Sequence, residues 1–264
     1  MKIAVTGING KMGGTIASLI MQDSIAEISS GLVRSSSGLE NHDLGEFLGF
    51  EKNNINITSK IDDFITSGDA VIDFSSPSLS IEIAKKCAEY KKVLVCGTTG
   101  FSEKEKHQFS SYAEQTVIIW SSNMSLGVNL LMNLAEKTAE ILHENFDIEI
   151  LEMHHNKKID APSGTALSLG LAVAKARGIK LEEKAIMNRV GKDSKRNKGE
   201  IGFATLRGGD VIGDHTVIFA GDGERIELSH KASNRDIFAK GAIRAAIWGS
   251  AQKPGFYSMR DVLS

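Results

Sequence analysis

The sequence predicts an α/β protein: an N-terminal parallel sheet covered by helices, and a second α+β domain that carries a mixed or antiparallel sheet. Three observations lead to this prediction. Short apolar runs alternate with helical patterns through the first 120 residues, as in a parallel sheet with both faces covered. Gly7, Gly10 and Gly13 follow the first apolar run directly. After Gly199, apolar and polar residues alternate instead, which is typical of antiparallel strands.

The first domain is expected to contain repeated strand–helix units. Its strands are predicted over residues 2–6, 25–33, 70–74, 92–96 and 117–120. Its helices are predicted over residues 15–21, 77–90 and 102–115. Each strand is a continuous apolar run and the helices fall between the strands, so the strands should lie parallel in a Rossmann-type sheet.

The pattern changes after residue 121. Helices are predicted over residues 126–145, 163–177 and 236–250, and strands over residues 147–155, 201–206, 216–220 and 224–229. The last three strands are expected to be antiparallel and joined by tight Gly-Gly-Asp and Gly-Asp-Gly connections. The polar segment 189–198 is expected to be a mobile loop. We therefore place a domain boundary near Ser122.

Charge and cysteine content exclude several classes of function. The 31 basic and 33 acidic residues give a net charge of −2, so no global field attracts nucleic acid or an anionic membrane. Cys87 and Cys96 are too few for a disulfide scaffold or a zinc site, and they fit a reducing interior. The sequence shows neither a signal peptide nor a membrane-spanning run, and the cytoplasm is the expected compartment.

The glycines after the first strand form a candidate nucleotide site. Gly7, Gly10 and Gly13 have the spacing GxxGxxG, where glycine permits a tight turn and the close approach of a pyrophosphate to a helix N-terminus. The spacing alone is a weak signal, and a glycine-rich turn without a ligand is the alternative. The position directly after the first strand of a βαβ unit favours the nucleotide.

The end of the second strand predicts a preference for NADPH. Val33 stands where an acidic residue usually binds the ribose hydroxyls of NAD. Arg34 can bind a 2′-phosphate, with Lys11 as a second cation. In the alternative, Arg34 is a solvated loop residue and both NADPH and NADH bind. Two later strand ends are expected at the same crevice: residues 74–77, and Gly97, Thr98 and Thr99 with Gly100.

The segment 152–165 is a candidate site for an acidic substrate. It holds two histidines at a strand end, two lysines in a loop and the start of a helix: His154, His155, Lys157, Lys158 and Ser163. Ser163, or Asp160 before it, can cap this helix, whose free amides bind anions. The alternatives are a structural histidine and solvated lysines. A metal site is not expected, because no third ligand stands at a suitable spacing.

These motifs together resemble the dihydrodipicolinate reductase family, whose members are 4-hydroxy-tetrahydrodipicolinate reductases. The matching segments are residues 5–13, 96–101, 123–129, 152–165, 201–207 and 230–233. They cover nearly the whole chain, from the first strand to the last helix. The block Glu-x-His-His…Lys-x-Asp-Ala-Pro-Ser-Gly-Thr is highly specific to this family.

The resemblance implies a fold, an assembly and a reaction. Residues 1–122, completed by residues 235–264, would form the dinucleotide-binding domain. Residues 123–234 would form the substrate-binding and oligomerisation domain of a homotetramer. The reaction would be the NAD(P)H-dependent reduction of a small cyclic dicarboxylic imine, 4-hydroxy-tetrahydrodipicolinate, to tetrahydrodipicolinate with loss of water, in lysine and diaminopimelate biosynthesis.

The resemblance also implies roles for single residues. His154 would be the acid/base or substrate-orienting histidine, and Lys158 the cationic proton donor. The substrate carboxylates would be bound by His155, Ser163, Gly164 and Thr165. Together with the residues named above, the resemblance gives a cofactor site of Gly7, Asn9, Gly10, Lys11, Met12, Gly13, Arg34, Gly97, Thr98, Thr99, Ser122, Asn123 and Met124.

Three positions depart from the family pattern. Val33 stands where members that use NADH well often carry an acidic residue, so NADPH is expected to be preferred, with NADH as the other candidate. Lys11 replaces the commoner arginine, and Ser76 replaces an arginine found in some relatives. Both changes are expected to weaken cofactor affinity.

Two rival functions remain open at the level of sequence. One is a Rossmann dehydrogenase of the semialdehyde or homoserine type, in which Cys96 would supply the thiolate nucleophile of a semialdehyde dehydrogenase. Cys96 has no base beside it in the sequence, which favours a buried packing role. The other rival is a non-enzymatic module that senses NADPH, in which His154 and Lys158 would have no catalytic task.

Overall fold

The computed structural model describes residues 1–264, which fold into two compact units. Unit 1 consists of Met1–Leu126 and Asp236–Ser264, and unit 2 consists of Gly127–Arg235. The chain passes between the units after residues 126 and 235, where the sequence placed the boundaries after 122 and 234. Each unit has its own sheet and its own apolar core.

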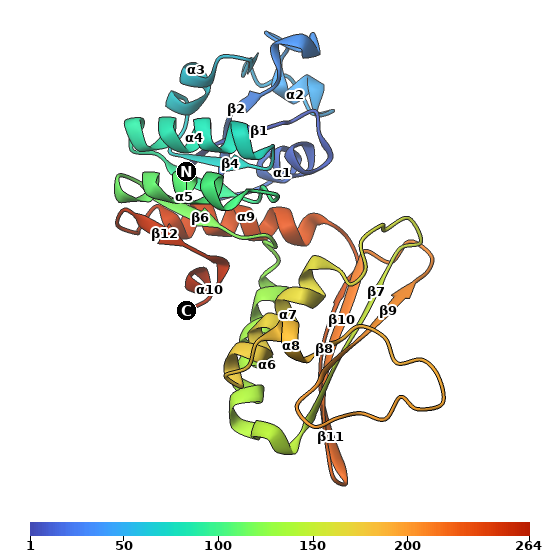
Figure 1. Cartoon of the computed structure of the whole chain (residues 1–264). Helices are drawn as coiled ribbons and strands as arrows, with labels where there is room; N and C mark the ends of the chain where they lie inside the picture. Colours follow the sequence, from blue (N-terminus) through green and yellow to red (C-terminus); the bar gives the residue numbers. More distant parts are fainter. The chain divides into compact units, whose positions relative to one another are not determined.

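Unit 1 contains a seven-stranded sheet in which all strand pairs are parallel. Its strands are β1 (Lys2–Thr6), β2 (Glu27–Leu32), β3 (Ile57–Thr58), β4 (Ala70–Asp73), β5 (Val93–Cys96), β6 (Val117–Trp120) and β12 (Gly255–Tyr257). The spatial order is β12-β6-β5-β4-β1-β2-β3 (Figure 1). β2 and β3 lie on one side of β1, and β4, β5, β6 and β12 lie on the other, so the strand order reverses between β1 and β4. Ligands of Rossmann folds bind at the carboxyl ends of the strands at such a reversal.

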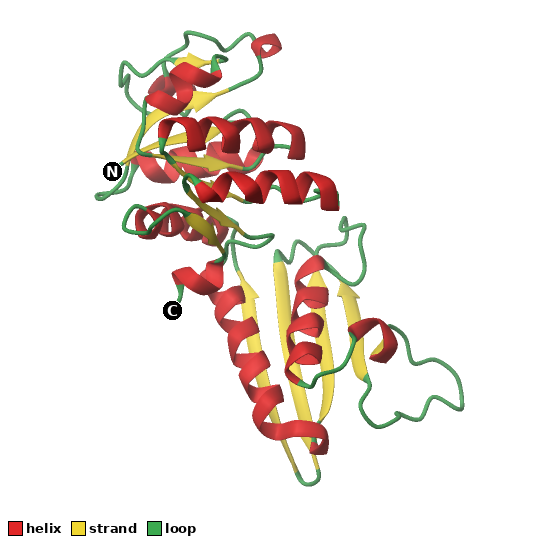
Figure 2. Ribbon diagram, turned by 60° about the vertical axis from the view of Figure 1, so that its left-hand side comes forward, coloured by secondary structure: helices red, strands yellow, loops and turns green.

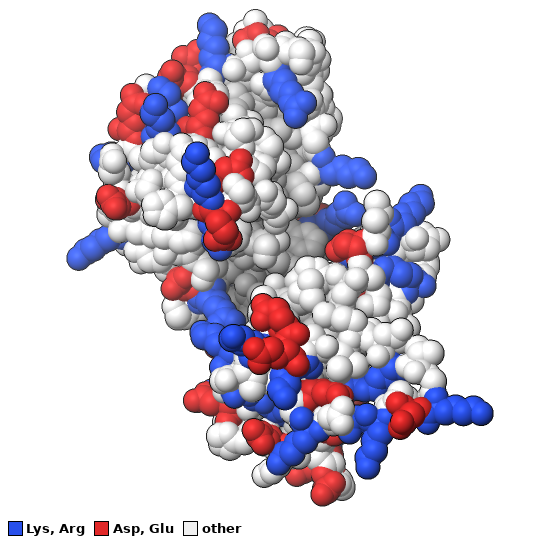
Figure 3. All heavy atoms as spheres, in the orientation of Figure 1, with Lys and Arg blue, Asp and Glu red and all other residues white.

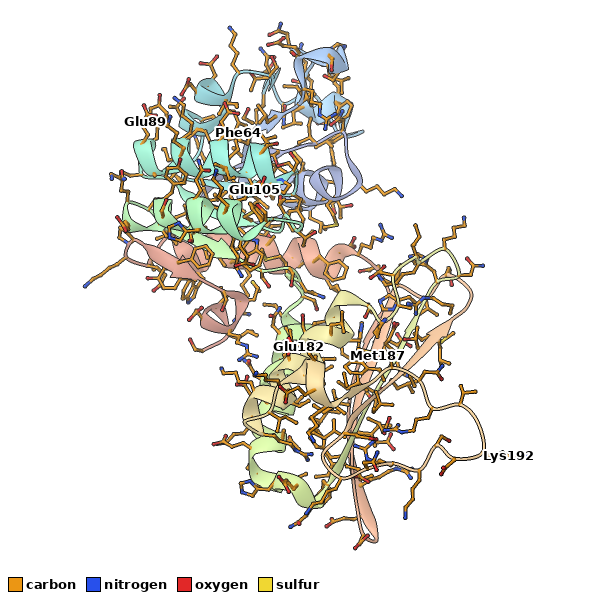
Figure 4. All side chains as sticks on the ribbon, viewed as in Figure 1. Phe64, Glu89, Glu105, Glu182, Met187 and Lys192 are labelled. Atoms are coloured by element: carbon orange, nitrogen blue, oxygen red, sulfur yellow. The ribbon has the colours of Figure 1, made fainter.

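Helices cover both faces of this sheet (Figure 2). They are α1 (Lys11–Met21), α2 (Leu44–Phe47), α3 (Ile61–Thr66), α4 (Pro77–Tyr90), α5 (Glu103–Ser111), α9 (Asp236–Gly249) and α10 (Met259–Val262). Successive residues of β1 serve opposite faces, since side chains alternate along a strand. Ile3 and Val5 pack with α1 and α9, whereas Ala4 joins the core under α3, α4 and α5. Phe64 of α3 is fully buried in that second core (Figure 4).

The parallel Rossmann-type sheet predicted from the apolar runs is confirmed, with differences at particular elements. The first helix begins at Lys11 and not at residue 15, because Gly13 and Gly14 interrupt its apolar periodicity without breaking the helix. The sequence did not predict β3 or β12, which have two and three residues. Strands this short are too brief to show a period.

Unit 2 contains a mixed five-stranded sheet with helices on one face. Its strands are β7 (Asp147–His154), β8 (Ala185–Ile186), β9 (Ile201–Arg207), β10 (Gly213–Gly221) and β11 (Glu224–Ala232). Its helices are α6 (Leu126–Leu142), α7 (Gly164–Ala176) and α8 (Leu181–Lys184). The first residue of α6, Leu126, is also the last residue of the first segment of unit 1. Ile148 and Ile150 of β7 pack in a core with Leu131 of α6 and Leu169 of α7. The opposite face carries Leu206, which is 48% exposed.

One strand pairing in unit 2 differs from the prediction. The sheet order is β11-β10-β7-β9-β8, so β9 is not the antiparallel neighbour of β10. β7 lies between them, antiparallel to β10 and parallel to β9. The Gly-Asp-Gly connection does join an antiparallel hairpin of β10 and β11, but the Gly-Gly-Asp segment is no hairpin. Alternation along a strand predicts a buried face and does not identify the neighbour.

The segment between β8 and β9, residues 187–200, contains no helix or strand. Arg189 connects it to the sheet, with ion pairs to Glu149 at 2.7 Å and to Glu200 at 3.2 Å. Lys192 lies at its outer turn (Figure 4). The mobility expected for residues 189–198 stays a prediction.

Two features bear on partners. No helix combines the length and the apolar character needed to cross a bilayer. On the face drawn in Figure 3, basic and acidic side chains are interspersed. That distribution agrees with the nearly balanced charge of the sequence.

Candidate functional site

The turn after β1 leaves backbone amides available at the start of α1. Gly7 has a φ of +59°, a conformation that glycine adopts without a steric penalty. Gly10 precedes α1, and no side chain caps the first turn of this helix. The amides of that turn lack intrahelical partners and can bind an anion. A Cβ on Gly13 would lie 2.2 Å from the Gly7 carbonyl oxygen, so the helix can approach the turn this closely only with glycine there.

A cavity of about 690 Å³ lies over the carboxyl ends of β1, β2 and β4. Gly7, Asn9 and Gly10 line it on one side, and Val33 and Arg34 line it beyond the end of β2. Val33 is buried and Arg34 is exposed. An uncapped helix start and a guanidinium thus border one cavity, and both suit phosphate groups.

The remaining predicted cofactor residues lie at several places in unit 1. Lys11 and Met12 open the first turn of α1. Gly97 packs against the Phe74 ring, since a Cβ there would lie 2.2 Å from Phe74 Cε1, and Phe74 lines the cavity. The lining residues include none of the following: Thr98, which is buried, Thr99 and Ser122, which are exposed, Asn123, which is half-buried, and Met124, which is 1% exposed.

Asp73, which was not predicted as a site residue from the sequence, organises the strand ends beneath the cavity. Its carboxylate is fully buried. Four hydroxyls donate to it: Thr6 Oγ1 at 2.7 Å, Ser75 Oγ at 2.6 Å, Ser80 Oγ at 2.5 Å and Thr98 Oγ1 at 3.2 Å. Thr98 Oγ1 in turn accepts from the Ser75 amide at 2.9 Å. The donors come from β1, α4 and the segments after β4 and β5, so one carboxylate ties these elements together. The only sequence signal was an acidic residue at the end of an apolar strand.

The structure argues against Cys96 as a nucleophile. Cys96 is fully buried, and its Sγ lies 3.6 Å from an Asp73 carboxylate oxygen. Burial, with the Asp73 charge beside it, raises the pKa of the Cys96 thiol. A nucleophilic cysteine needs the thiolate and access to substrate, so Cys96 is a packing residue.

A polar cluster in unit 2 is centred on Glu152, whose side chain is 1% exposed. Arg207 of β9 donates to both carboxylate oxygens, at 2.9 and 3.1 Å. His154 Nδ1 lies 2.5 Å from Oε2, and the Ser163 amide donates to Oε1 at 3.0 Å. Burial raises the pKa of Glu152, but these hydrogen bonds outweigh it and the net pKa is lowered. Glu152 is therefore a carboxylate.

His154 is buried on the helix-covered side of the sheet, 8% exposed. Burial lowers the pKa of His154, and the Glu152 carboxylate opposes this only in part. The ring makes an edge-on contact with His215 of β10, with 5.1 Å between ring centroids. Gly213 leaves space for it, since a Cβ there would lie 3.0 Å from His154 Nε2. His154 is thus neutral at pH 7 and held in a defined orientation.

Lys158 and His155 belong to the turn that follows β7. Lys158 Nζ lies 2.8 Å from an Asp160 carboxylate oxygen, and its side chain is 20% exposed. The Lys158 amide donates to the His155 carbonyl at 3.1 Å, which closes the turn. His155 is half-buried, and its Nδ1 atom is buried without a hydrogen-bond partner. The two residues therefore present a cation and an imidazole on one turn.

The start of α7 adds helix amides to unit 2. Ser163 caps the helix, and its Oγ accepts from the Ala166 amide at 3.1 Å. The same Oγ lies 3.0 Å from His215 Nε2. No atom lies within 4 Å of a Cβ built on Gly164, so the Gly164 backbone faces open space. Ser163 is 2% exposed, its side chain is engaged and its amide donates to Glu152, so this residue can act on an anion only through the helix that it caps.

Three members of this cluster were not assigned from sequence: Glu152, Arg207 and His215. Glu152 stands two residues before His154, so strand periodicity placed them on one face and could have suggested the contact. Arg207 and His215 come from strands 55 and 52 residues away from their partners. No local pattern indicates these pairings.

Family models match both halves of the chain. The model described as "Dihydrodipicolinate reductase, N-terminus" matches residues 1–124, and "Dihydrodipicolinate reductase, C-terminus" matches residues 127–263. Two curated relatives named 4-hydroxy-tetrahydrodipicolinate reductase are 48% identical to the chain. The protein from Beijerinckia indica aligns over 100% of this chain and 97% of its own length. The protein from Agrobacterium fabrum aligns over 100% and 96%.

Solved structures show the same similarity. A dipicolinate-bound dihydrodipicolinate reductase from Paenisporosarcina sp. TG-14 has a TM-score of 0.79 and 25% identity, and it covers 99% of this chain and 98% of that one. An amine dehydrogenase from Mycobacterium smegmatis has a TM-score of 0.64 at 11% identity, over 98% and 95% of the two chains. The second match shows a shared fold alone.

Proposed function

The chain belongs to the dihydrodipicolinate reductase family, and from this premise we propose that it reduces 4-hydroxy-tetrahydrodipicolinate to tetrahydrodipicolinate. The observation that carries the proposal is the polar cluster of unit 2. A neutral, oriented imidazole at His154, the Lys158 ammonium and the uncrowded start of α7 at Gly164 come together there. These groups suit a small substrate that carries carboxylates and that receives a proton during the reaction.

The cofactor proposed for unit 1 is NAD(P)H. The uncapped start of α1 and the glycine turn fit a pyrophosphate, and Gly7, Asn9 and Gly10, which line the cavity, would hold it. Lys11, Met12 and Gly13 follow at the helix start. When bound, the cofactor supplies a hydride. Further contacts are proposed for the loops after β5 and β6, through Gly97, Thr98, Thr99, Ser122, Asn123 and Met124.

NADPH is the proposed preferred form, with NADH as the weaker one. Arg34 borders the cavity and Val33 offers no acceptor for ribose hydroxyls. A guanidinium binds a 2′-phosphate through charge-assisted hydrogen bonds, whereas NADH offers it only a hydroxyl.

Substrate binding is proposed for the turn after β7 and the start of α7. His155, Ser163, Gly164 and Thr165 would hold the two carboxylates, Ser163 through the helix it caps. The overall reaction consumes 4-hydroxy-tetrahydrodipicolinate, NAD(P)H and one proton, and yields tetrahydrodipicolinate, NAD(P)⁺ and water. Hydride addition leaves an enamine-like carbon, and the Lys158 ammonium would donate the proton to it. His154 would orient the substrate or relay that proton. The Lys158 ammonium would also stabilise the negative charge that develops on the substrate.

The proposed setting is a homotetramer in the cytoplasm that serves lysine and diaminopimelate biosynthesis. The open face of the unit 2 sheet supports the assembly, since Leu206 is 48% exposed on it beside the half-buried Met153. Neither nucleic acid nor a membrane is proposed as a partner. Light scattering should give four times the chain mass of 28.5 kDa, and a monomer or dimer would contradict the assembly.

A coupled assay tests the reaction. Pyruvate, aspartate semialdehyde and the synthase that condenses them generate the substrate, and nicotinamide absorbance is followed with NADPH and NADH in parallel. We expect oxidation that requires the synthase and is faster with NADPH. Equal rates would remove the cofactor preference and leave the reaction intact. No oxidation from folded protein that binds the nucleotide would contradict the proposed reaction.

A further inference from the structure

The Glu152 carboxylate connects its own strand β7 with the start of α7 and with Arg207 of β9, which is 55 residues away in the sequence. Its Oε2 atom meets His154 Nδ1 and Arg207 Nη1, at 2.5 and 2.9 Å. Its Oε1 atom meets Arg207 Nη2 and the Ser163 amide, at 3.1 and 3.0 Å. The carboxylate thus has two partners at each oxygen while its side chain is 1% exposed. A buried charge with this complete set of partners has a geometry fixed by the fold.

We propose that Glu152 and Arg207 are a positioning pair for the reaction, in which Glu152 holds His154 as the Nδ1–H tautomer and Arg207 offsets the charge of Glu152. The same carboxylate aligns the start of α7 through the Ser163 amide. The inference rests on the proposed function in one respect: His154 is taken to act on the substrate. The pair itself is defined by contacts within the chain.

The tautomer follows from the chemistry of the acceptor. An ionised carboxylate only accepts hydrogen bonds, so the proton of the neutral His154 ring must lie on Nδ1 to reach Glu152. Nε2 is then left as an acceptor. It lies beside Gly213, where a Cβ would approach Nε2 to 3.0 Å, so glycine leaves this nitrogen uncrowded from that side. The hydrogen bond made by one ring nitrogen of a histidine determines which nitrogen carries the proton, and so which nitrogen is free to react.

Four ionisable groups face His154. Glu152 lies on its own strand, Arg207 on β9, Lys158 in the following turn, and His215 on β10. Glu152 favours the imidazolium, whereas Arg207 and Lys158 disfavour it. His215 is neutral, because burial lowers its pKa to about 4. Without Arg207, no guanidinium offsets the negative charge of Glu152. That charge then stabilises the imidazolium of His154 more strongly, so the pKa of His154 should rise.

Arg207 also fixes the loop that carries Lys158. Its Nη2 donates to the Asp160 carbonyl at 2.7 Å, and the Asp160 carboxylate pairs with Lys158. One guanidinium therefore contacts both the partner of His154 and the loop of the proposed proton donor. Arg207→Lys would keep the positive charge but not the forked set of contacts that the guanidinium makes.

Nitrogen-15 NMR of histidine-labelled protein tests the pair directly, with the His154 signals assigned by loss in His154→Asn. In the wild type we expect the Nδ1–H tautomer. In Arg207→Met the pKa of His154 should rise by about one unit or more, the usual size for one nearby charge. In Arg207→Lys the pKa of His154 should return most of the way to its wild-type value, because the positive charge is kept. Arg244→Met, which removes an exposed arginine of α9 in unit 1, is the matched control and should leave His154 unchanged.

Glu152→Gln tests the tautomer separately. The amide can donate or accept, so it no longer enforces one ring tautomer, and an Nε2–H population should appear. An Nε2–H tautomer in the wild type, or an identical His154 titration in wild type and Arg207→Met, would overturn the inference. If Arg207→Met fails to fold, the tautomer in the wild type and the spectra of Arg207→Lys and Glu152→Gln still test the positioning pair.

The pH dependence of kcat/KM separates this inference from the proposed function. The inflection that depends on His154 should move in Arg207→Met by the same shift that NMR reports. If NMR shows the shift but no variant or wild type turns over the proposed substrate, the positioning pair stands and the function fails. If turnover is normal and its profile does not move, the pair is structural only and the inference fails.

Discussion

At the scale of single residues, two side chains of unit 1 have separable tasks. Asp73 is buried and receives four hydroxyl donors. Arg34 is exposed at the rim of the cavity. A buried hub contributes to stability, because each donor left without an acceptor is costly. An exposed cation at a cavity contributes to ligand selection.

Replacement of Asp73 should destabilise the protein strongly. Asp73→Ala leaves four donors unpaired, and we expect a loss of about 3 kcal/mol or more in the free energy of unfolding. Asp73→Asn keeps one acceptor and should lose about half as much. Asp63→Ala, at an exposed position of α3, is the control and should change stability by about 0.5 kcal/mol. Urea unfolding followed by circular dichroism measures all three, and a loss below about 1 kcal/mol for Asp73→Ala would refute the hub.

Replacement of Arg34 should change cofactor selection and not turnover in general. Hydrogen bonds to charged groups contribute about 1.5–3 kcal/mol, so Arg34→Ala should lower kcat/KM for NADPH by roughly 10- to 100-fold. The value for NADH should change little, because NADH lacks the 2′-phosphate. Arg244→Ala is the control for loss of an arginine. Equal losses with both cofactors would show that Arg34 does not recognise the 2′ position.

At the scale of elements, α7 depends on the residue at its start. Ser163 caps the helix and contacts His215 with the same oxygen. Ser163→Ala should reduce stability by about 1 kcal/mol, the usual contribution of a cap. Ser168 in the same helix bonds only to the Gly164 carbonyl, and Ser168→Ala should cost less than about 0.5 kcal/mol. Thermal unfolding compares the two, and equal effects would remove the special role of the cap.

Sheet pairing in unit 2 shows the limit of prediction at this scale. The strand periods of β7, β9, β10 and β11 were visible in the sequence. The neighbour relations were not, and β9 was wrongly expected beside β10. Since β7 enters between them, it brings Glu152 opposite both Thr205 of β9 and His215 of β10. The polar cluster therefore exists only with this order of strands.

At the scale of the whole molecule, stability should fall on acidification through the buried histidines. The pKa of His215 is about 4 in the folded protein and about 6.5 in an unfolded chain. Its contribution is therefore complete above pH 6.5 and is lost as the pH falls from 6.5 toward 4. The loss is about 3 kcal/mol at most. In His215→Gln the decline over this range should be shallower by that amount, as urea unfolding at several pH values would show. Parallel curves would mean that His215 is not buried as a neutral ring.

The sequence by itself determined the features that depend on neighbouring residues. The apolar runs predicted the parallel sheet of unit 1, and the glycine spacing predicted the turn before α1, because strand period and turn geometry are local properties. The cavity is lined by Gly7, Asn9, Gly10 and Arg34, all four of which the sequence had selected. The segment 152–165 stands out because its histidines, lysines and helix start are contiguous.

Only the tertiary structure decided which distant groups meet. Asp73 accepts hydrogen bonds from hydroxyls at three strand ends and on a helix, and Glu152 meets Arg207 across 55 residues. Such contacts depend on the order of strands in a sheet, which is selected by burial of whole faces and by the connections between strands. A local pattern reports which face of a strand is apolar but not which strand will lie beside it. The partners of His154 and of the strand ends under the cavity were therefore set by the fold.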